Sequence, residues 1–194
     1  MNSTITGAIL AGGKSSRMGR DKALLKLDGR PFVEHVASTL REVFDRVILV
    51  ANDPSAYRFL GLETIGDIYQ DCGPLGGIHS ALVHAGSADI FVSACDTPFV
   101  TRELVRYIVG FDLNAPARIP SFKQQLHPLC GIYTQGCLAP IVKRLEVRRL
   151  RVVDFVESIH AEVIPISPNL AFYKEDLFAN FNTSEDYSHN KNDL

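Results

Sequence analysis

The sequence lacks the features of a membrane or nucleic-acid-binding protein. No apolar run approaches the roughly 18 residues that a membrane-spanning helix requires. No basic stretch precedes the first apolar run, so we expect no secretory signal peptide. Lysine and arginine total 20 against 22 aspartate and glutamate residues, a net charge of −2. This balance gives no general attraction to nucleic acid or to an anionic membrane surface, and we expect neither as a partner.

Cysteine is scarce and is not arranged for metal binding. The four cysteines contain no C-x-x-C pair and stand far apart, at positions 72, 95, 130 and 137. This spacing argues against a zinc site and against a disulfide framework. We expect buried thiols in a reducing, cytoplasmic protein.

Two common phosphate-binding loops are also missing. Gly13, Lys14 and Ser15 match the end of a Walker loop, but its first glycine would have to stand at Ala8. Lys14 likewise interrupts the Gly-x-Gly-x-x-Gly pattern of dinucleotide-binding domains. Any phosphate site must therefore have a different loop.

Such a loop is present in residues 9–22, ILAGGKSSRMGRDK. It follows an apolar run, Ile5–Leu10, that predicts a buried parallel strand. It holds three glycines, two serines and four basic residues. The backbone of Gly12 and Gly13 can approach phosphate oxygens closely, and Arg17 and Lys22 can neutralise their charge. An ordinary strand-to-helix turn with solvated charges is the alternative, but the whole stretch favours a polyphosphate site.

This stretch also carries a resemblance. The pattern LAGG-x-S-x-R-M-G-x-D-K, from Leu10 to Lys22, resembles the signature of the molybdenum cofactor guanylyltransferases. Relatives that use CTP or other nucleotides usually have LAAG, so the Gly12-Gly13 pair after Ala11 resembles the guanine-using branch. Further similar segments occupy residues 71–77, 94–98, 127–133 and 180–186, the last with Ser184 where the family has proline.

The resemblance implies an α/β fold with three layers, α/β/α, around a mostly parallel twisted sheet of the glycosyltransferase-A-like type. The chain length favours one domain over residues 1–187, followed by a polar tail over 188–194. Apolar patterning predicts strands at 5–10, 46–51, 61–65, 89–94, 126–133 and 161–166. It predicts helices over 32–44, after a glycine-rich loop at 71–77, and over 101–109, 136–150 and 152–156. Between residues 111 and 125 we expect an irregular excursion that covers a second substrate.

Two aspartates stand where strands are predicted to end. Asp96 follows the strand at 89–94, and a carboxylate at this edge of a parallel sheet is a natural ligand for a hard divalent cation. It resembles the family's Mg²⁺-binding aspartate, so we expect Mg²⁺ as cofactor. The alternative is a helix-capping or turn aspartate before Thr97 and Pro98. Asp67 resembles a family position that contacts the nucleotide.

The second substrate is harder to place. Asn180 and Asn182 match family positions linked to the pterin, although residues 182–186 can also cap a final helix. Arg148 can contact the pterin phosphate, or belong to a solvated helix end with its arginine neighbours. His127, beside a proline, is more often structural than chemical.

The resemblance implies transfer of GMP from GTP to the terminal phosphate of molybdopterin or of its molybdenum-loaded form, with release of pyrophosphate. In this scheme the backbone of Leu10, Ala11, Gly12 and Gly13 holds the nucleotide. Arg17, Lys22 and Asp96 act in catalysis, and Lys22, Asp67 and Asp96 also contact the nucleotide. The protein partners implied are molybdenum-insertion proteins and apo-molybdoenzymes or their chaperones.

One residue departs from the family pattern. Val50 stands where an asparagine often lies near the base, so guanine selectivity is less secure than nucleotide binding. The alternatives are a molybdopterin cytidylyltransferase, a sugar-phosphate nucleotidyltransferase, or a non-catalytic GTP-binding adaptor that delivers the cofactor.

Overall fold

The computed structural model describes residues 5–11, 21–111 and 114–179. Within these residues the main sheet has eight strands, seven of them in the order β10-β7-β9-β6-β1-β4-β5, and β8 pairs with β7. The strands are β1 (Ile5–Leu10), β4 (Val47–Val50), β5 (Glu63–Ile65), β6 (Asp89–Ala94), β7 (Ala117–Phe122), β8 (Gln125–Leu126), β9 (Cys130–Tyr133) and β10 (Glu162–Ile166). A separate hairpin joins β2 (Lys26–Leu27) to β3 (Arg30–Pro31).

The sheet is mostly parallel. β6, β1, β4 and β5 are parallel neighbours, and β10 is parallel to β7. β9 runs antiparallel to both β6 and β7, and β8 is antiparallel to β7. The mixed but mostly parallel arrangement confirms the fold class expected from the sequence.

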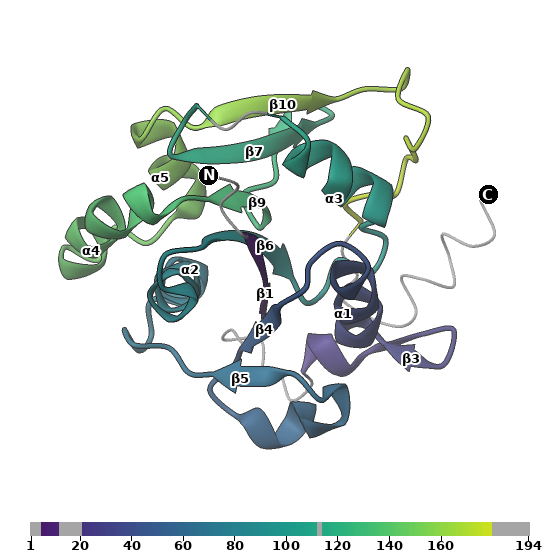
Figure 1. Cartoon of the computed structure of the whole chain (residues 1–194), viewed down its shortest axis with the longest axis horizontal. Coiled ribbons are helices and arrows are strands. Elements are labelled where there is room, and N and C mark those ends of the chain that lie inside the picture. The colour runs from purple at the N-terminus through teal and green to yellow at the C-terminus, as the bar shows by residue number, and fades with distance from the viewer. Residues whose placement is uncertain (1–4, 12–20, 112–113, 180–194) are drawn as a thin grey trace.

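Helices cover both faces of this sheet (Figure 1). Ile9, Leu49 and Phe91 belong to one buried cluster, together with helices α1 (Phe32–Arg41) and α3 (Arg102–Val109). Their neighbours in the same strands, such as Ala8 and Ile48, face the other cluster. That cluster is completed by α2 (Gly73–Ala85), α4 (Leu138–Glu146) and α5 (Val152–Ser158). Both faces of the strands are buried, which explains their unbroken apolar runs.

Three short 3₁₀ helices complete the described elements. They are η2 (Lys22–Leu24), η3 (Pro54–Leu60) and η4 (Gln135–Cys137). In the residues that the structure describes, every helix is too short or too polar to cross a bilayer.

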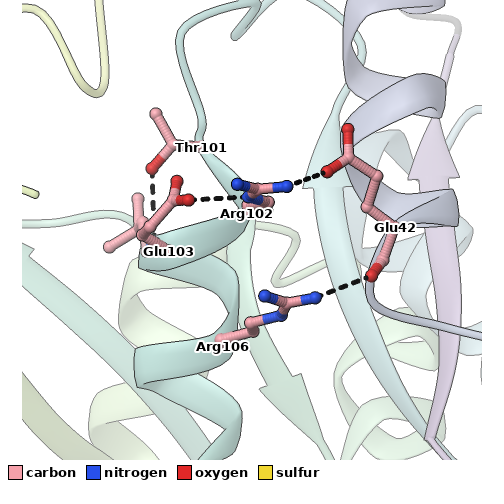
Figure 2. A network of polar contacts seen from close by, with 6 residues as sticks. Glu42, Thr101, Arg102, Glu103 and Arg106 are labelled. Carbon is pink, nitrogen blue, oxygen red and sulfur yellow. Dashed lines mark hydrogen bonds and ion pairs between the residues drawn. The ribbon is translucent and has the colours of Figure 1, made fainter.

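Helices α1 and α3 lie side by side and are joined by exposed polar contacts (Figure 2). Arg102 Nη1 lies 3.0 Å from the carboxylate of Glu42, and its Nε bonds to Glu103. Arg106 donates to the backbone carbonyl of Glu42. The end of α1 is thus held against the first turns of α3.

Two expectations from the sequence are wrong. The excursion expected over residues 111–125 contains β7, which lies inside the main sheet between β9 and β10. Pro120 is tolerated there because the antiparallel partner changes around it. β9 pairs with Ala117 and Arg118, whereas β8 pairs with Ser121 and Phe122.

The glycine-rich stretch at 71–77 is likewise not a loop throughout. Helix α2 begins at Gly73, so Gly76 and Gly77 belong to its first turns. Gly73, the first residue of the helix, adopts a φ of +59°, a left-handed conformation that glycine tolerates easily.

Candidate functional site

The carboxyl ends of four adjacent strands form one edge. Leu10 at the end of β1 is in register with Val50 of β4 and Ala94 of β6, and Val50 is in register with Ile65 of β5. Backbone hydrogen bonds continue beyond the strands, from Cys95 N to the Leu10 carbonyl over 3.2 Å. The segments that leave these strands therefore emerge side by side, as ligand-binding edges of parallel sheets do.

Lys22 lies at this edge in the turn of η2, next to Asp96. It is half-buried. The Asp21 side chain caps this turn by accepting the Ala23 N–H over 3.0 Å. The Lys22 ammonium is close enough to lower the pKa of the Asp96 carboxyl, against a larger effect of burial that raises it. The structure thus brings together two residues that stand 74 positions apart in the sequence.

Asp96 follows β6 directly and does not cap the next helix. Thr101 caps α3 by accepting the Leu104 N–H over 3.3 Å. Burial is the main influence on the Asp96 carboxyl and raises its pKa, while its own backbone N–H and Lys22 lower it. A half-buried carboxylate whose charge is disfavoured gains from a nearby cation.

The single carboxylate of Asp96 fits Mg²⁺, which proteins often hold through one or two carboxylates with substrate phosphates and water completing its shell. Among the residues described, no group of three or more histidine, cysteine, aspartate or glutamate side chains is gathered to hold a metal. A metal here would therefore depend on the phosphates of its substrate.

Asp67 lies beyond β5 and is held by Asn52, which follows β4. Asn52 Nδ2 donates to the Asp67 carboxylate over 3.0 Å, and Asn52 Oδ1 accepts the Asp67 N–H over 2.9 Å. Burial raises the pKa of Asp67, and the hydrogen bond from Asn52 opposes this rise. The two side chains form a fixed polar pair beside the end of β1.

Helix α2 begins close to this pair. A Cβ atom built on Gly77 would lie 3.2 Å from Cδ2 of Leu10 and 3.8 Å from Oδ1 of Asp67. The absence of a side chain at Gly77 therefore lets the first turns of α2 approach the strand ends. The predicted nucleotide residues Leu10 and Asp67 thus share one small region.

Val50 cannot provide a polar group to a base. It is 3 % exposed and packs in the cluster under α2. Asn52, two residues later, carries the amide at this strand end, and both its polar groups are engaged with Asp67.

Arg148 lies at the start of α2, outside the helix that was expected to contain it. Helix α4 ends at Glu146, and Arg148 adopts a φ of +56°. Its guanidinium donates to the Asp71 carbonyl over 3.2 Å and lies 3.5 Å from Sγ of Cys72. This places a positive charge near the N-terminus of α2, about one helical turn before Gly77.

His127 is held by aromatic packing. Its ring stacks on Phe178 with the centroids 4.0 Å apart, and Phe122 packs against both rings. Burial lowers the pKa of His127, while a hydrogen bond with the backbone of Phe122 opposes this shift. These contacts agree with a structural role.

Comparison with known proteins identifies the family. Residues 7–160 match the model of the MobA-like NTP transferase domain. The chain belongs to the MobA-like NTP transferase family. Within it, a probable molybdenum cofactor guanylyltransferase of Clostridium perfringens is 36 % identical over 186 residues, covering 94 % of this chain and 93 % of the relative. The molybdenum cofactor guanylyltransferase of Desulfosudis oleivorans is 34 % identical, covering 94 % and 92 %.

A solved structure agrees with this membership. Molybdopterin-guanine dinucleotide biosynthesis protein A of Archaeoglobus fulgidus superposes with a TM-score of 0.79 at 26 % identity, covering 95 % of this chain and 96 % of that one. This MobA-like chain is therefore a nucleotidyltransferase, and it resembles the guanylyltransferases over nearly its whole length.

The structure tests only part of the predicted site of this MobA-like transferase. Leu10, Ala11, Lys22, Asp67 and Asp96 gather at one edge of the sheet. Arg148, also predicted, lies beside the start of α2. The remaining predicted site residues, Gly12, Gly13, Arg17, Asn180 and Asn182, lie outside the described residues, as does the tail 188–194. The roles assigned to all of these site residues stay predictions.

Sequence reasoning missed three members of this edge. From the sequence, no role was assigned to Asn52, Asp21 or Tyr57. Asp21 could have been suspected, because an aspartate before a short turn commonly caps it. Nothing in the sequence signals that Tyr57, from η3, donates a hydrogen bond to Asp21.

Proposed function

We propose that this protein transfers GMP from GTP to the terminal phosphate of molybdopterin, most simply in its molybdenum-loaded form. The products are molybdopterin guanine dinucleotide and pyrophosphate. The supporting observation is the convergence of Lys22, Asp67 and Asp96 at the ends of adjacent parallel strands. The names of the two curated relatives support the choice of guanine and of the molybdenum cofactor.

The reaction is an in-line displacement at the α-phosphorus of GTP. An oxygen of the molybdopterin phosphate forms a new bond to this phosphorus, and the bond from the α-phosphorus to the bridging oxygen of pyrophosphate breaks. The bonding electrons leave with pyrophosphate, so negative charge grows on the leaving group. Positioning and charge neutralisation supply most of the catalysis in such reactions.

Lys22 is the described residue placed to meet this charge. Its turn is fixed by the Asp21 cap, and its ammonium faces the region of Asp96. We propose that Arg17 adds a second positive charge, and that backbone N–H groups from Leu10 to Gly13 hold the nucleotide. Asp67, fixed by Asn52, contacts the nucleoside from the β5 side of the edge.

Asp96 is the residue that would hold Mg²⁺. When bound, the ion would supply Lewis-acid stabilisation of the negative charge on the phosphates. The half-buried position of Asp96 suits this role, because the cation would offset the burial that disfavours the carboxylate.

The acceptor would approach past the start of α2. We propose Arg148, Asn180 and Asn182 as pterin-binding residues, with Arg148 supplying positive charge beside the start of α2. We further propose that the dinucleotide product passes to molybdenum-insertion proteins, apo-molybdoenzymes or their chaperones in the cytoplasm. The four free thiols support a reducing compartment.

Replacement of Asp96 tests the proposal. We expect Asp96→Ala to lower Mg²⁺-dependent pyrophosphate release from GTP and molybdopterin by at least about 100-fold, because the phosphate charge loses its metal. Circular dichroism should remain that of the wild type. Asp89→Asn is the matched control at the opposite end of β6, since asparagine can still accept the Gln135 N–H. Full activity in Asp96→Ala would refute the metal assignment.

The same assay with other nucleotides separates the alternatives. A guanylyltransferase releases pyrophosphate with GTP and molybdopterin but not with CTP. A preference for CTP would identify a cytidylyltransferase, and activity only with a sugar phosphate would identify a sugar nucleotidyltransferase. Tight GTP binding without turnover would indicate a delivery adaptor.

A further inference from the structure

The Asp21 carboxylate has both oxygens engaged, although it was assigned no part in binding or catalysis. Oδ1 accepts the Ala23 N–H over 3.0 Å, and Oδ2 accepts the hydroxyl of Tyr57. Asp21 immediately precedes Lys22. Its two hydrogen bonds therefore fix the backbone from which the Lys22 side chain extends.

Tyr57 comes from a different part of the chain and is rigidly placed. It lies in η3, follows β4, and is 4 % exposed within the core cluster that also contains Ile9 and Ala23. Burial, followed by the bond to Asp21, raises the pKa of the Tyr57 hydroxyl well above its ordinary value. The hydroxyl thus stays protonated and remains a donor to the carboxylate.

Segments that follow three adjacent strands meet at Lys22. Tyr57 follows β4, the Asp21 turn follows β1, and Asp96 follows β6. The turn itself is closed by bonds from Leu24 N to the Asp21 carbonyl and from Leu25 N to the Lys22 carbonyl. Tyr57 holds this turn from the β4 side, while the Lys22 charge acts on Asp96 on the β6 side.

We propose that Tyr57 and Asp21 are a pair of positioning residues that hold Lys22 in place for the phosphates of the nucleotide. Neither residue touches the substrate in this scheme. A lysine side chain has many rotamers and loses this freedom when its ammonium engages a phosphate. If the backbone is already fixed, ordering the main chain adds no further loss of entropy. The inference rests on the proposed function, because it requires Lys22 to bind nucleotide phosphates.

The proposal is tested by asking whether the effect of Tyr57 requires Lys22. We expect Tyr57→Phe to lower kcat/KM for Mg²⁺·GTP about tenfold in the protein with Lys22. In a Lys22→Met background the same substitution should change kcat/KM and the Kd for Mg²⁺·GTP less than twofold. The two effects are non-additive only if the hydroxyl acts through the lysine.

Two further variants distinguish positioning from general stability. Asp21→Ala should lose as much activity as Tyr57→Phe or more, and Asp21→Asn should recover part of it, because the amide oxygen can still cap the turn. Tyr173→Phe is the matched control. It removes a hydroxyl that donates to Glu175 over 3.0 Å, from a ring that packs on Phe122 of β7. We therefore expect kcat/KM to be unchanged.

Equal losses from Tyr57→Phe in both backgrounds would overturn the proposal, since they would reflect general loosening of the core. No loss in either background would also overturn it. Failure of the proposed function has a separate signature. In that case Lys22→Met alone leaves kcat/KM and the Kd for Mg²⁺·GTP unchanged, which removes the role of the lysine and of the pair together.

Discussion

The lack of a side chain at Gly77 keeps helix α2 close to the end of β1. A Cβ atom there would approach Cδ2 of Leu10 to 3.2 Å and Cδ1 to 3.5 Å. Such a contact is accommodated only if the Leu10 side chain shifts by a few tenths of an ångström. Leu10 and Asp67 both belong to the proposed nucleotide site, so a single methyl group can alter binding at this edge without unfolding the protein.

We therefore expect Gly77→Ala to weaken GTP binding about tenfold while stability stays close to that of the wild type. Alanine improves the helical propensity of α2, which offsets part of the steric cost. Equilibrium binding of Mg²⁺·GTP and thermal unfolding measure the two effects.

Gly66→Ala is the matched control, because its Cβ would meet Asn52 Oδ1 at an ordinary 3.5 Å. It should bind GTP as the wild type does. Wild-type affinity in Gly77→Ala would show that the Leu10 side chain has room to move without consequence.

At the scale of elements, two arginines join helices to their neighbours in different ways. Arg102 is exposed, pairs with Glu42 at the end of α1, and pairs with its neighbour Glu103 within α3 (Figure 2). Arg118 of β7 is fully buried, pairs with Glu162 of β10, and donates to the carbonyls of Ile108 and Phe111. Solvent screens the first arrangement more strongly than the second, in which the guanidinium is buried.

We expect Arg118→Met to lower the free energy of unfolding by about 3 kcal/mol, because the buried carbonyls at the end of α3 lose their donor. Urea denaturation measures the change. Arg102→Met is the matched substitution at an exposed arginine. Its free energy of unfolding should be close to that of the wild type, and closer still at high salt. Equal destabilisation by the two variants would contradict the claim that the contacts of Arg118 stabilise the protein more than those of Arg102.

At the scale of the whole molecule, stability should depend on pH through two histidines, the buried His79 and the half-buried His127. Burial lowers the pKa of His79 and of His127. Within the described residues, His79 Nδ1 and His127 Nε2 have no hydrogen-bond partner. The unfolded chain therefore takes up protons at these sites at a higher pH than the folded protein does, so stability falls as pH drops below about 6.5.

We expect the denaturant concentration at the unfolding midpoint to decrease as the pH is lowered from 7.5 to 5.5. We expect this decrease to be smaller in His79→Leu. Chemical denaturation at several pH values measures the slope. His160→Asn is the matched control, because His160 is exposed and its φ of +52° suits asparagine. An unchanged slope in His79→Leu would exclude this histidine as a source of the pH dependence.

The parts of the fold that follow from local pattern were predicted well. Ile5–Leu10 and Asp89–Ala94 are mostly apolar runs with the bounds expected, because both faces of these central strands are buried. The strand at Ala117–Phe122 was missed because Pro120 argues against a strand unless its changing partners are known. The early start of α2 was not predicted, because glycines such as Gly76 and Gly77 are more common in loops than in helices.

The same contrast applies to the candidate site. Asp67 and Asp96 could be placed at the sheet edge because each follows a predicted strand. The pairing of Asn52 with Asp67 and of Tyr57 with Asp21 depends on how loops from different strands pack, which no local pattern encodes. Burial of Arg118 depends in the same way on the placement of β10.

The sheet order also affects the order in which the strands can fold during synthesis. β1 lies between β4 and β6, and β5 completes this group, so all four strands come from the first 94 residues. β7, β9 and β10 arrive later and extend the sheet outward from β6. Because domains fold as their segments leave the ribosome, the strands that precede Lys22, Asp67 and Asp96 can assemble first. Until β9 arrives, the open side of β6 is the surface that a growing chain most needs protected from wrong pairing.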